Sequence, residues 1–221
     1  MDRWVVLDVG ETLIDETRVW SLWADMLGVP RLTFMAAFGS LIARGNEFRD
    51  IFEMFGLADW RTRWPDHEAI YGGFQAQDLY PDALPAIAAL HAKGYRVAVI
   101  GNQPASRSEQ LHALGVDVEV IAMSEAMGIA KPAPAFFDRT LELIGSPDPG
   151  SVAYVGDRVE NDVLPSAAAG MRAVWIRRGP WGVIQRMPDG AQPALVVDSL
   201  AQLAERIDEA WSRLPPNEAS G

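Results

Sequence analysis

Residues 5–15 read Val-Val-Leu-Asp-Val-Gly-Glu-Thr-Leu-Ile-Asp, and this stretch decides the fold class. Its apolar run Val5–Leu7 has no polar alternation, which is typical of a strand buried on both faces. Asp8 stands at the C-terminal end of the run, and Gly10 lets the chain turn soon afterwards. Ligands of open α/β sheets bind at this edge of the sheet. Asp8 is therefore a candidate reactive carboxylate.

Apolar runs and helical patterns alternate along most of the chain. The runs predict strands at Trp4–Asp8, Arg96–Ile100, Val118–Ile121, Val152–Val155 and Ala173–Ile176. The periodic segments predict helices at Pro81–Lys93, Ala105–Leu114, Pro134–Ile144, Glu160–Ala169 and Ser199–Leu214. Strands that alternate with helices form a parallel, right-handed sheet with helices on both faces. The fold class is thus α/β, a Rossmann-like doubly wound parallel sheet.

Residues 16–78 interrupt this alternation. They carry no convincing strand, but they contain four of the eight tryptophans and amphipathic stretches such as Val19–Leu27 and Leu32–Ala43. We interpret 16–78 as an inserted helical domain, and 1–15 together with 79–221 as the core domain. We expect the four tryptophans to form the interior of the insert rather than a platform for substrate. The tail after Leu214 is expected to be frayed.

Composition narrows the function classes. Hydrophobic residues make up 49% of the 221 residues, enough for a sizeable core. The chain has no cysteine, which excludes disulfides and thiol nucleophiles and is compatible with a cytoplasmic location. We expect no signal peptide and no membrane span, because no apolar run approaches 18 residues. A formal net charge of −11 disfavours binding to nucleic acid or to anionic membranes.

Three later segments carry further polar residues that fit the first one. They are Val97–Asn102, Gly128–Pro134 and Val155–Asp162. With Asp8, and in this order, they resemble the motifs of the haloacid dehalogenase (HAD) superfamily of aspartate-nucleophile hydrolases. The insert at 16–78 resembles the helical cap that one type of this superfamily (C1, subfamily I) carries after its first motif. The resemblance spans nearly the whole chain.

The resemblance implies roles for particular residues. Asp8 matches the nucleophile, which forms an aspartyl-phosphate, and Lys131 matches the lysine that stabilises charge. Asp8, the backbone carbonyl of Gly10, Asp157 and Asp162 match the metal site. An oxygen-rich set of this kind suits Mg²⁺. Taken alone, Asp157 and Asp162 could equally cap a helix.

Phosphate binding is assigned to the turn after the second predicted strand. The resemblance implies that Gly101, Asn102 and Lys131 hold the phosphoryl oxygens. Most phosphatases of the superfamily carry Ser or Thr where this chain has Gly101. The loss of that hydroxyl removes one hydrogen bond, worth about 1.5–3 kcal/mol to a charged group. On its own, the segment would be an ordinary turn.

The general acid is the second departure from the family pattern. Most phosphatases of the superfamily carry an Asp two residues after the nucleophile, and this chain has Gly10 there. Glu11, Asp15 or Glu16 could supply the proton instead, or the substrate could have a leaving group that needs none. Glu11 could also serve only as a salt-bridge or capping residue.

The sequence therefore predicts a Mg²⁺-dependent hydrolase, most simply a phosphatase of a small phosphorylated metabolite. One alternative is a hydrolase of C–halogen or C–P bonds with the same fold. The retained Gly156-Asp157 motif argues against dehalogenation, because the L-2-haloacid dehalogenases need no metal. The other alternative is a degenerate member that binds a phosphorylated ligand or a protein. Whether the chain is a monomer or a homodimer stays open.

A basic and aromatic segment follows the last predicted strand. It reads Arg177-Arg178-Gly179-Pro180-Trp181-Gly182. We expect a loop, either at the rim of the active site or with Trp181 packed inward and the two arginines in solvent.

Overall fold

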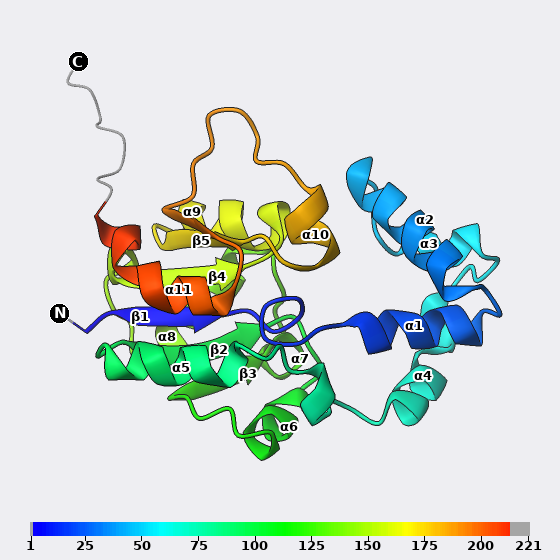
Figure 1. The fold of residues 1–221 in the computed structure, drawn as a ribbon, viewed down its shortest axis with the longest axis horizontal. Helices are drawn as coiled ribbons and strands as arrows, with labels where there is room; N and C mark the ends of the chain where they lie inside the picture. The colour runs from blue at the N-terminus through cyan, green and yellow to red at the C-terminus, as the bar shows by residue number, and fades with distance from the viewer. Residues whose placement is uncertain (1, 213–221) are drawn as a thin grey trace.

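A six-stranded parallel sheet forms the centre of the protein in the computed structural model, which describes residues 2–212 (Figure 1). The strands are β1 (Trp4–Leu7), β2 (Arg96–Gly101), β3 (Val120–Met123), β4 (Val152–Gly156), β5 (Arg172–Ile176) and β6 (Leu195–Val197), in the spatial order β3-β2-β1-β4-β5-β6. Val5 pairs with Val97 on one side and with Ala153 on the other, so β1 lies in the middle. The predicted doubly wound α/β fold is confirmed.

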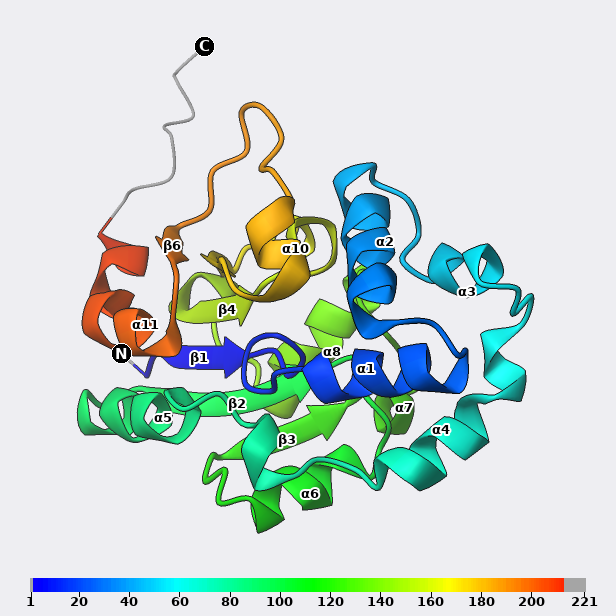
Figure 2. The same ribbon diagram turned by 45° about the vertical axis from the view of Figure 1, so that its right-hand side comes forward.

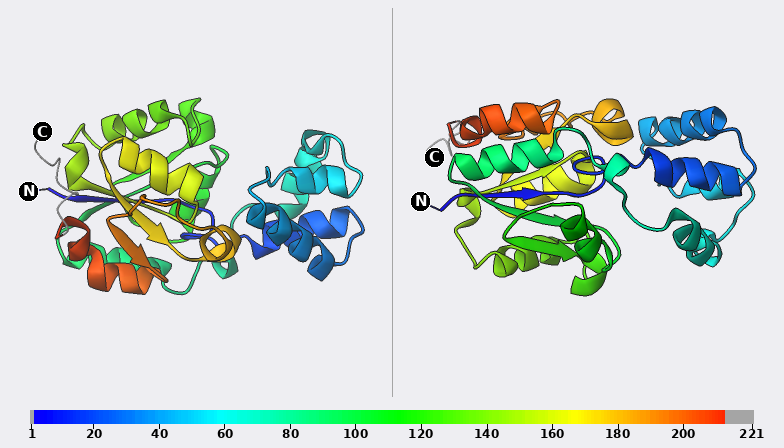
Figure 3. Two further views of the ribbon diagram at one scale, coloured as in Figure 1. Left: turned by 90° about the horizontal axis from the view of Figure 1, so that it is seen from above. Right: turned by 60° about the horizontal axis from the view of Figure 1, so that its bottom comes forward.

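Helices cover both faces of this sheet (Figure 3). They are α5 (Ala83–Ala92), α6 (Arg107–Ala113), α8 (Pro134–Leu143), α9 (Leu164–Ala168) and α11 (Leu200–Arg206). Two shorter helices, α7 (Ser124–Met127) and α10 (Gly179–Ile184), lie at the carboxyl edge of the strands (Figure 1). Val5 and Leu7 pack in one apolar cluster with α5 and α11, while Trp4 and Val6 pack in another with α8. Both faces of β1 are buried, which explains why its sequence shows no polar alternation.

Residues 16–78 contain helices and turns but no strand, and these helices lie beyond the carboxyl edge of the strands (Figures 1 and 2); we call them the helical lobe. Its helices are α1 (Thr17–Met26), α2 (Arg31–Ala43), α3 (Asp50–Met54) and α4 (Trp64–Tyr71), with short 3₁₀ turns η1 (Trp60–Thr62) and η2 (Ala76–Asp78). Trp20 and Trp23 are buried in its interior, and Trp60 and Trp64 pack against them. The predicted packing of the four tryptophans in the interior of the insert is confirmed for Trp20 and Trp23. Trp60 and Trp64 are only partly buried, and all four also line the large cavity described below.

The two ends of this lobe leave the sheet at the same point. Ile14 forms a β-bridge with Leu79. The backbone N–H of Asp15 donates to the carbonyl of Asp78 at 2.7 Å, and that of Tyr80 donates to the carbonyl of Leu13 at 2.9 Å. A segment closed at its base in this way can be inserted into a loop without disturbing the sheet beneath it.

Several predicted elements differ from the structure. The three-residue strand β6 was not predicted, because it is too short to show a pattern. Strand β3 begins two residues later than predicted. The predicted helix 160–169 is a π turn, η4 (Val159–Val163), followed by α9, in which Pro165 has no N–H to continue the hydrogen-bond ladder. The predicted helix 199–214 is α11 followed by a 3₁₀ turn, η5 (Ile207–Trp211). A further 3₁₀ turn, η3 (Pro149–Ser151), precedes β4.

The predicted tail after Leu214 lies outside the described residues. Within residues 2–212, no single helix is long and apolar enough to cross a membrane. Helices α1 and α2 together reach that length and composition, but the chain bends by 113° between them.

Candidate active site

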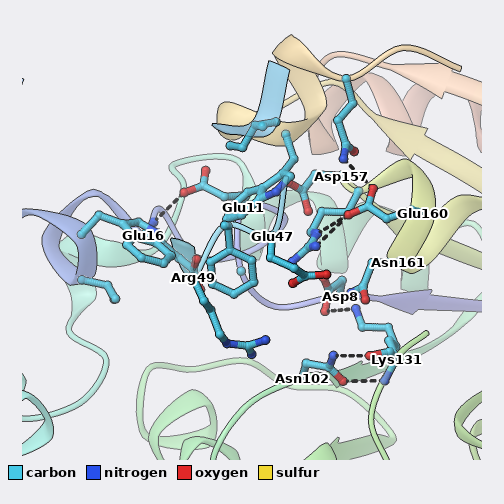
Figure 4. Close-up of a pocket in the computed structure, with 18 of the residues that line it drawn as sticks. Asp8, Glu11, Glu16, Glu47, Arg49, Asn102, Lys131, Asp157, Glu160 and Asn161 are labelled. Carbon is cyan, nitrogen blue, oxygen red and sulfur yellow. Dashed lines mark hydrogen bonds and ion pairs between the residues drawn. The ribbon is translucent and has the colours of Figure 1, made fainter. Parts of the chain in front are cut away.

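Four charged side chains meet where β1 and β4 end. Asp8 follows β1, Asp157 follows β4, Asp162 lies in the π turn η4, and Lys131 comes from the loop before α8. One carboxylate oxygen from each of the three aspartates lies within 4.8 Å of the other two. Nζ of Lys131 lies 2.7 Å from Oδ1 of Asp8 and 2.6 Å from Oδ1 of Asp162. Figure 4 shows Lys131 beside Asp8 at the bottom of a pocket.

Burial and mutual repulsion perturb these groups. Burial, reinforced by the charge of Asp162, raises the pKa of Asp8 to about 6 even though Lys131 opposes the rise. Burial and the charges of Asp162 and Asp8 hold the pKa of Asp157 well above its usual range. Burial alone would lower the pKa of Lys131, but Asp162 and Asp8 raise it well above its usual value. One ammonium is thus too little positive charge for three carboxylates.

The three aspartates fit a hard divalent cation. Oδ2 of Asp157 is buried and has no hydrogen-bond partner, although buried carboxylate oxygens are normally paired. The carbonyl of Asp157 accepts a hydrogen bond from Nε1 of Trp175 at 2.9 Å, which fixes this turn. Asp162 has both oxygens engaged, one by Lys131 and the other by the backbone N–H of Arg158 at 3.0 Å. Asp157 and Asp8 therefore offer more free oxygen to a cation than Asp162 does.

Two glycines of the predicted motifs make this crowding possible. A Cβ on Gly101 would overlap Oδ1 of Asp8 and lie 3.0 Å from Cγ2 of Val9. A Cβ on Gly156 would lie 2.6 Å from Cβ of Asp162. Gly101, in place of the usual hydroxyl residue, gives Asp8 its space.

Asn102 is occupied by the loop that carries the lysine. Its Nδ2 donates to the carbonyl of Lys131 at 3.0 Å, and its Oδ1 accepts from the backbone N–H of Lys131 at 2.8 Å. The Asn102 side chain therefore positions Lys131. Contact with phosphate by the backbone amides at this turn stays a prediction.

A cavity of about 1210 Å³ lies between the sheet edge and the helical lobe. Asp8 and Lys131 line it from the sheet, and Trp20 and Arg49 line it from the lobe. Arg158 also lines it and was missed by the sequence analysis, although it directly follows Asp157 in the acidic motif. Its guanidinium pairs with Glu160 at 2.7 Å and lies 4.8 Å from the ring centre of Trp181.

The three carboxylates proposed to replace the missing acid lie in different surroundings. Glu11, at φ 51°, accepts hydrogen bonds from the Tyr80 hydroxyl at 2.6 Å and from the backbone N–H of Glu16 at 3.0 Å. Burial and Glu16 raise the pKa of Glu11 to about 7. Asp15 accepts from the backbone N–H of Thr17 at 2.8 Å and lines a different cavity.

The side chain of Glu16 lies beside Gly10 in space, and it lines the large cavity. A Cβ on Gly10 would lie 2.8 Å from Cδ of Glu16 and closer still to its Oε1. Gln103 donates to Oε1 of Glu16 at 3.3 Å. Burial and the nearby Asp8 raise the pKa of Glu16.

The segment 177–182 differs from the predicted loop. It enters helix α10, and Trp181 is buried among aromatic rings of the helical lobe. Arg178 is also largely buried and pairs with Asp82, so the expectation that both arginines lie in solvent is wrong for Arg178. Arg177 is half-exposed and pairs with Asp198.

Known proteins resemble this chain in sequence. A phosphoserine phosphatase from Thermus thermophilus is 32% identical over 169 residues, which cover 75% of this chain and 66% of that protein. The plasmid phosphoglycolate phosphatase of Cupriavidus necator is 29% identical over 219 residues, 92% of this chain and 90% of that one. For the Thermus protein and two other curated relatives, the match spans 38% to 66% of the relative's own length.

The fold matches solved structures. The HAD-hydrolase YfnB from Bacillus subtilis, solved with bound magnesium, superposes with a TM-score of 0.72 at 17% identity over 94% of this chain and 99% of that one. The family model described as haloacid dehalogenase-like hydrolase matches residues 3–170, which include all four charged residues of the site. The chain therefore belongs to the haloacid dehalogenase-like hydrolase family.

Proposed function

We propose that this protein is a Mg²⁺-dependent phosphatase that acts on a small phosphorylated metabolite through an aspartyl-phosphate at Asp8. The observation that carries the proposal is the buried cluster of Asp8, Asp157 and Asp162, bridged by Lys131 and containing an unpaired oxygen on Asp157. The relatives named as phosphatases of phosphoserine and phosphoglycolate support the reaction class, and they leave the substrate of this chain open.

The reaction proceeds in two displacements. An oxygen of Asp8 attacks phosphorus, the bond to the ester oxygen breaks, and water then attacks the phosphorus of the aspartyl-phosphate. Lys131, held against Asp8 and backed by Asp162, offsets the repulsion between the nucleophile and the anionic substrate. A divalent cation held by Asp8 and Asp157, with Asp162 behind them, would add positive charge where the phosphoryl oxygens lie. The carbonyl of Gly10 is proposed to complete the cation site, and backbone amides at 101–102 the phosphate site.

We further propose that residues 16–78 act as a cap over the core, 1–15 and 79–221. The lobe stands over the carboxyl edge of the strands (Figure 2). Its residues contribute much of the wall of the large cavity. Its two ends meet at the bridge between Ile14 and Leu79, a narrow base about which a lobe can move. A cap in this position encloses substrate and excludes water.

A single assay set tests the reaction class. Purified protein is incubated with phosphoserine, phosphoglycolate, glyceraldehyde 3-phosphate and 4-nitrophenyl phosphate, with Mg²⁺ or with chelator, and phosphate release is measured. We expect release that requires Mg²⁺. Chloride release from 2-chloropropionate in the presence of chelator would instead show a dehalogenase. Binding of phosphate esters without turnover would show a degenerate member.

A further inference from the structure

A phosphatase that acts on alkyl phosphates has to protonate the departing oxygen, and position 10 supplies no donor for this step. Loss of a general acid costs about 10²–10⁴-fold in rate. The replacement has to lie beside Gly10, face the same cavity as Asp8, and carry an oxygen that is not already committed. The structure allows the three nearby carboxylates to be compared on these points.

Glu11 and Asp15 do not meet these conditions. Glu11 is turned toward Tyr80, and both of its oxygens accept hydrogen bonds. The Glu11 carboxylate also packs against Gly179 at the start of α10, because a Cβ added to Gly179 would collide with it. Asp15 caps the first turn of α1 through Thr17 and faces a cavity that does not include Asp8.

Glu16 meets all of them. Its carboxylate lies where a side chain at position 10 would begin, within 2.8 Å of the Cβ position. Although Glu16 is the N-cap residue of α1, its side chain makes no capping hydrogen bond. Gln103, on the turn after β2, donates to its Oε1 at 3.3 Å. The indole of Trp20 lies near the same carboxylate, but its Nε1 completes no hydrogen bond, so Oε2 stays available. Glu16 also shares the cavity with Asp8.

Resting on the proposed phosphatase function, we propose that Glu16 replaces the missing acid and that Gly10 makes room for it. When Asp8 attacks phosphorus, the phosphorus–oxygen bond of the ester breaks and Glu16 gives its proton to the departing oxygen. When water attacks the aspartyl-phosphate, Glu16 takes a proton from that water. Phosphate leaves, and Asp8 and Glu16 return to their starting states. The reaction consumes one ester and one water and yields one alcohol and one phosphate.

The proton donor in this arrangement belongs to the helical lobe. Glu16 is the first residue of the segment 16–78, whereas Asp8 and Lys131 belong to the core. A donor at the base of a cap reaches the reacting oxygen only when the cap is correctly seated, which couples closure to proton transfer.

The test uses the full-length protein with Mg²⁺, and compares phenyl and glycerol phosphates with 4-nitrophenyl phosphate. Glu16→Gln keeps the shape and removes the proton. We expect it to slow glycerol phosphate hydrolysis by about 10²–10⁴-fold. With 4-nitrophenyl phosphate it should retain a stoichiometric burst of nitrophenolate and lose the following steady state, because nitrophenolate departs unprotonated while the water step still needs a base. Asp15→Asn, the matched control, should behave as the parent.

A rescue variant provides the second arm. Gly10→Asp alone should be impaired, because its side chain collides with Glu16. Gly10→Asp combined with Glu16→Ala places a carboxylate at position 10 in the space that Glu16 vacates, and it should recover glycerol phosphate hydrolysis relative to Glu16→Ala. Thermal melting confirms that each variant is folded.

The outcomes separate the two proposals. If the parent releases phosphate and Glu16→Gln keeps the same rates for all esters, Glu16 is not the proton donor. The same conclusion follows if the loss in Glu16→Gln is equal for every leaving group and no burst remains. If the parent releases phosphate from no ester, the phosphatase proposal itself fails.

Discussion

At the scale of single residues, the site holds more negative than positive charge. Asp8, Asp157 and Asp162 lie within 4.8 Å of one another, and Lys131 is the cation that pairs directly with two of them. Ionising all three carboxylates in a buried place is unfavourable without a further positive charge. Proton, cation and substrate therefore compete for the same few oxygens.

The first prediction concerns the nucleophile. Asp8→Asn preserves the size of the side chain but removes the attacking charge, so phosphate release should fall to the background rate. The fold should survive, because burial already raises the pKa of Asp8 to about 6 and its ionised form is costly. Circular dichroism and a phosphate-release assay provide the check. Retained hydrolysis in a pure Asp8→Asn preparation would contradict the covalent mechanism.

The second prediction concerns pH and metal together. Without cation, the folded protein holds the Asp8 proton more tightly than the unfolded chain does. The free energy of unfolding should therefore fall as pH rises from about 4 to about 6. A cation must displace that proton, so stabilisation by Mg²⁺ should be small at about pH 5 and larger at about pH 7.5.

Thermal melts with and without MgCl₂ at both pH values measure this. At about 100 times the dissociation constant, the gain should approach about 2.7 kcal/mol at the higher pH. CaCl₂ and KCl at matched ionic strength separate site binding from screening. An effect of Mg²⁺ that does not depend on pH would contradict the assignment of Asp8 as a ligand.

The sequence predicts which residues lie close together where those residues stand at the ends of strands. Asp8 and Asp157 follow β1 and β4, and Gly101 is the last residue of β2; the carboxyl ends of these neighbouring parallel strands must meet at one edge. The position of Glu16 was not predictable in the same way. The sequence left it as one of three candidates, because the direction of its side chain depends on the turn between Gly10 and α1.

At the scale of elements, one ion pair joins three segments. Arg178, just before α10, donates to Asp82 at the start of α5 and to the carbonyl of Thr12. Asp82 also accepts from the backbone N–H of Leu200, at the start of α11. Because Arg178 also lies over the ring of Tyr80 at 4.0 Å, it holds the surroundings of Glu11 in place.

The third prediction compares two adjacent arginines. Arg178→Ala removes one partner of a largely buried pair and should lower the free energy of unfolding by about 3 kcal/mol. Arg177→Ala removes an exposed pair with Asp198 and should cost less than about 1 kcal/mol. Urea denaturation of both variants measures the difference. Equal losses would mean that Arg178 does not join these segments.

Elements with long, regular patterns were predicted within one or two residues, as α5 and α8 show. The misses have physical causes. Strand β6 has three residues, and its pairing with β5 depends on a partner that lies distant in sequence. Helix α10 contains Gly179, Pro180 and Gly182, which favour a turn locally, but the burial of Trp181 against the helical lobe outweighs this preference.

At the scale of the whole molecule, α10 connects the core to the helical lobe. It packs beside α2 (Figures 1 and 2). The Trp181 ring centre lies 5.2 Å from that of Phe38 and 5.7 Å from that of Phe48. The sequence predicted the sheet and the helical insert, but not this contact, since neither segment shows from its own pattern which surface it covers.

The fourth prediction follows from that contact. Trp181→Ala should lower the free energy of unfolding by about 3 kcal/mol through the cavity that it leaves. It should also raise KM more than it lowers kcat, because a loosely seated lobe closes the substrate cavity less well. Trp181→Phe, which keeps an aromatic contact, should lie between the parent and Trp181→Ala. A stability loss with unchanged KM would show that this contact does not hold the cavity closed.

The central claim is that phosphate passes through a covalent bond to Asp8. Protein mixed with excess 4-nitrophenyl phosphate and Mg²⁺ is quenched in acid within one turnover, digested at low pH, and its peptides are analysed by mass spectrometry. We predict a phosphoryl group on Asp8 in the peptide that contains residues 5–15, absent from Asp8→Asn and absent when chelator replaces Mg²⁺. Turnover with no phosphoryl group on Asp8 under conditions in which the water step is slow, such as in Glu16→Gln, would contradict the account.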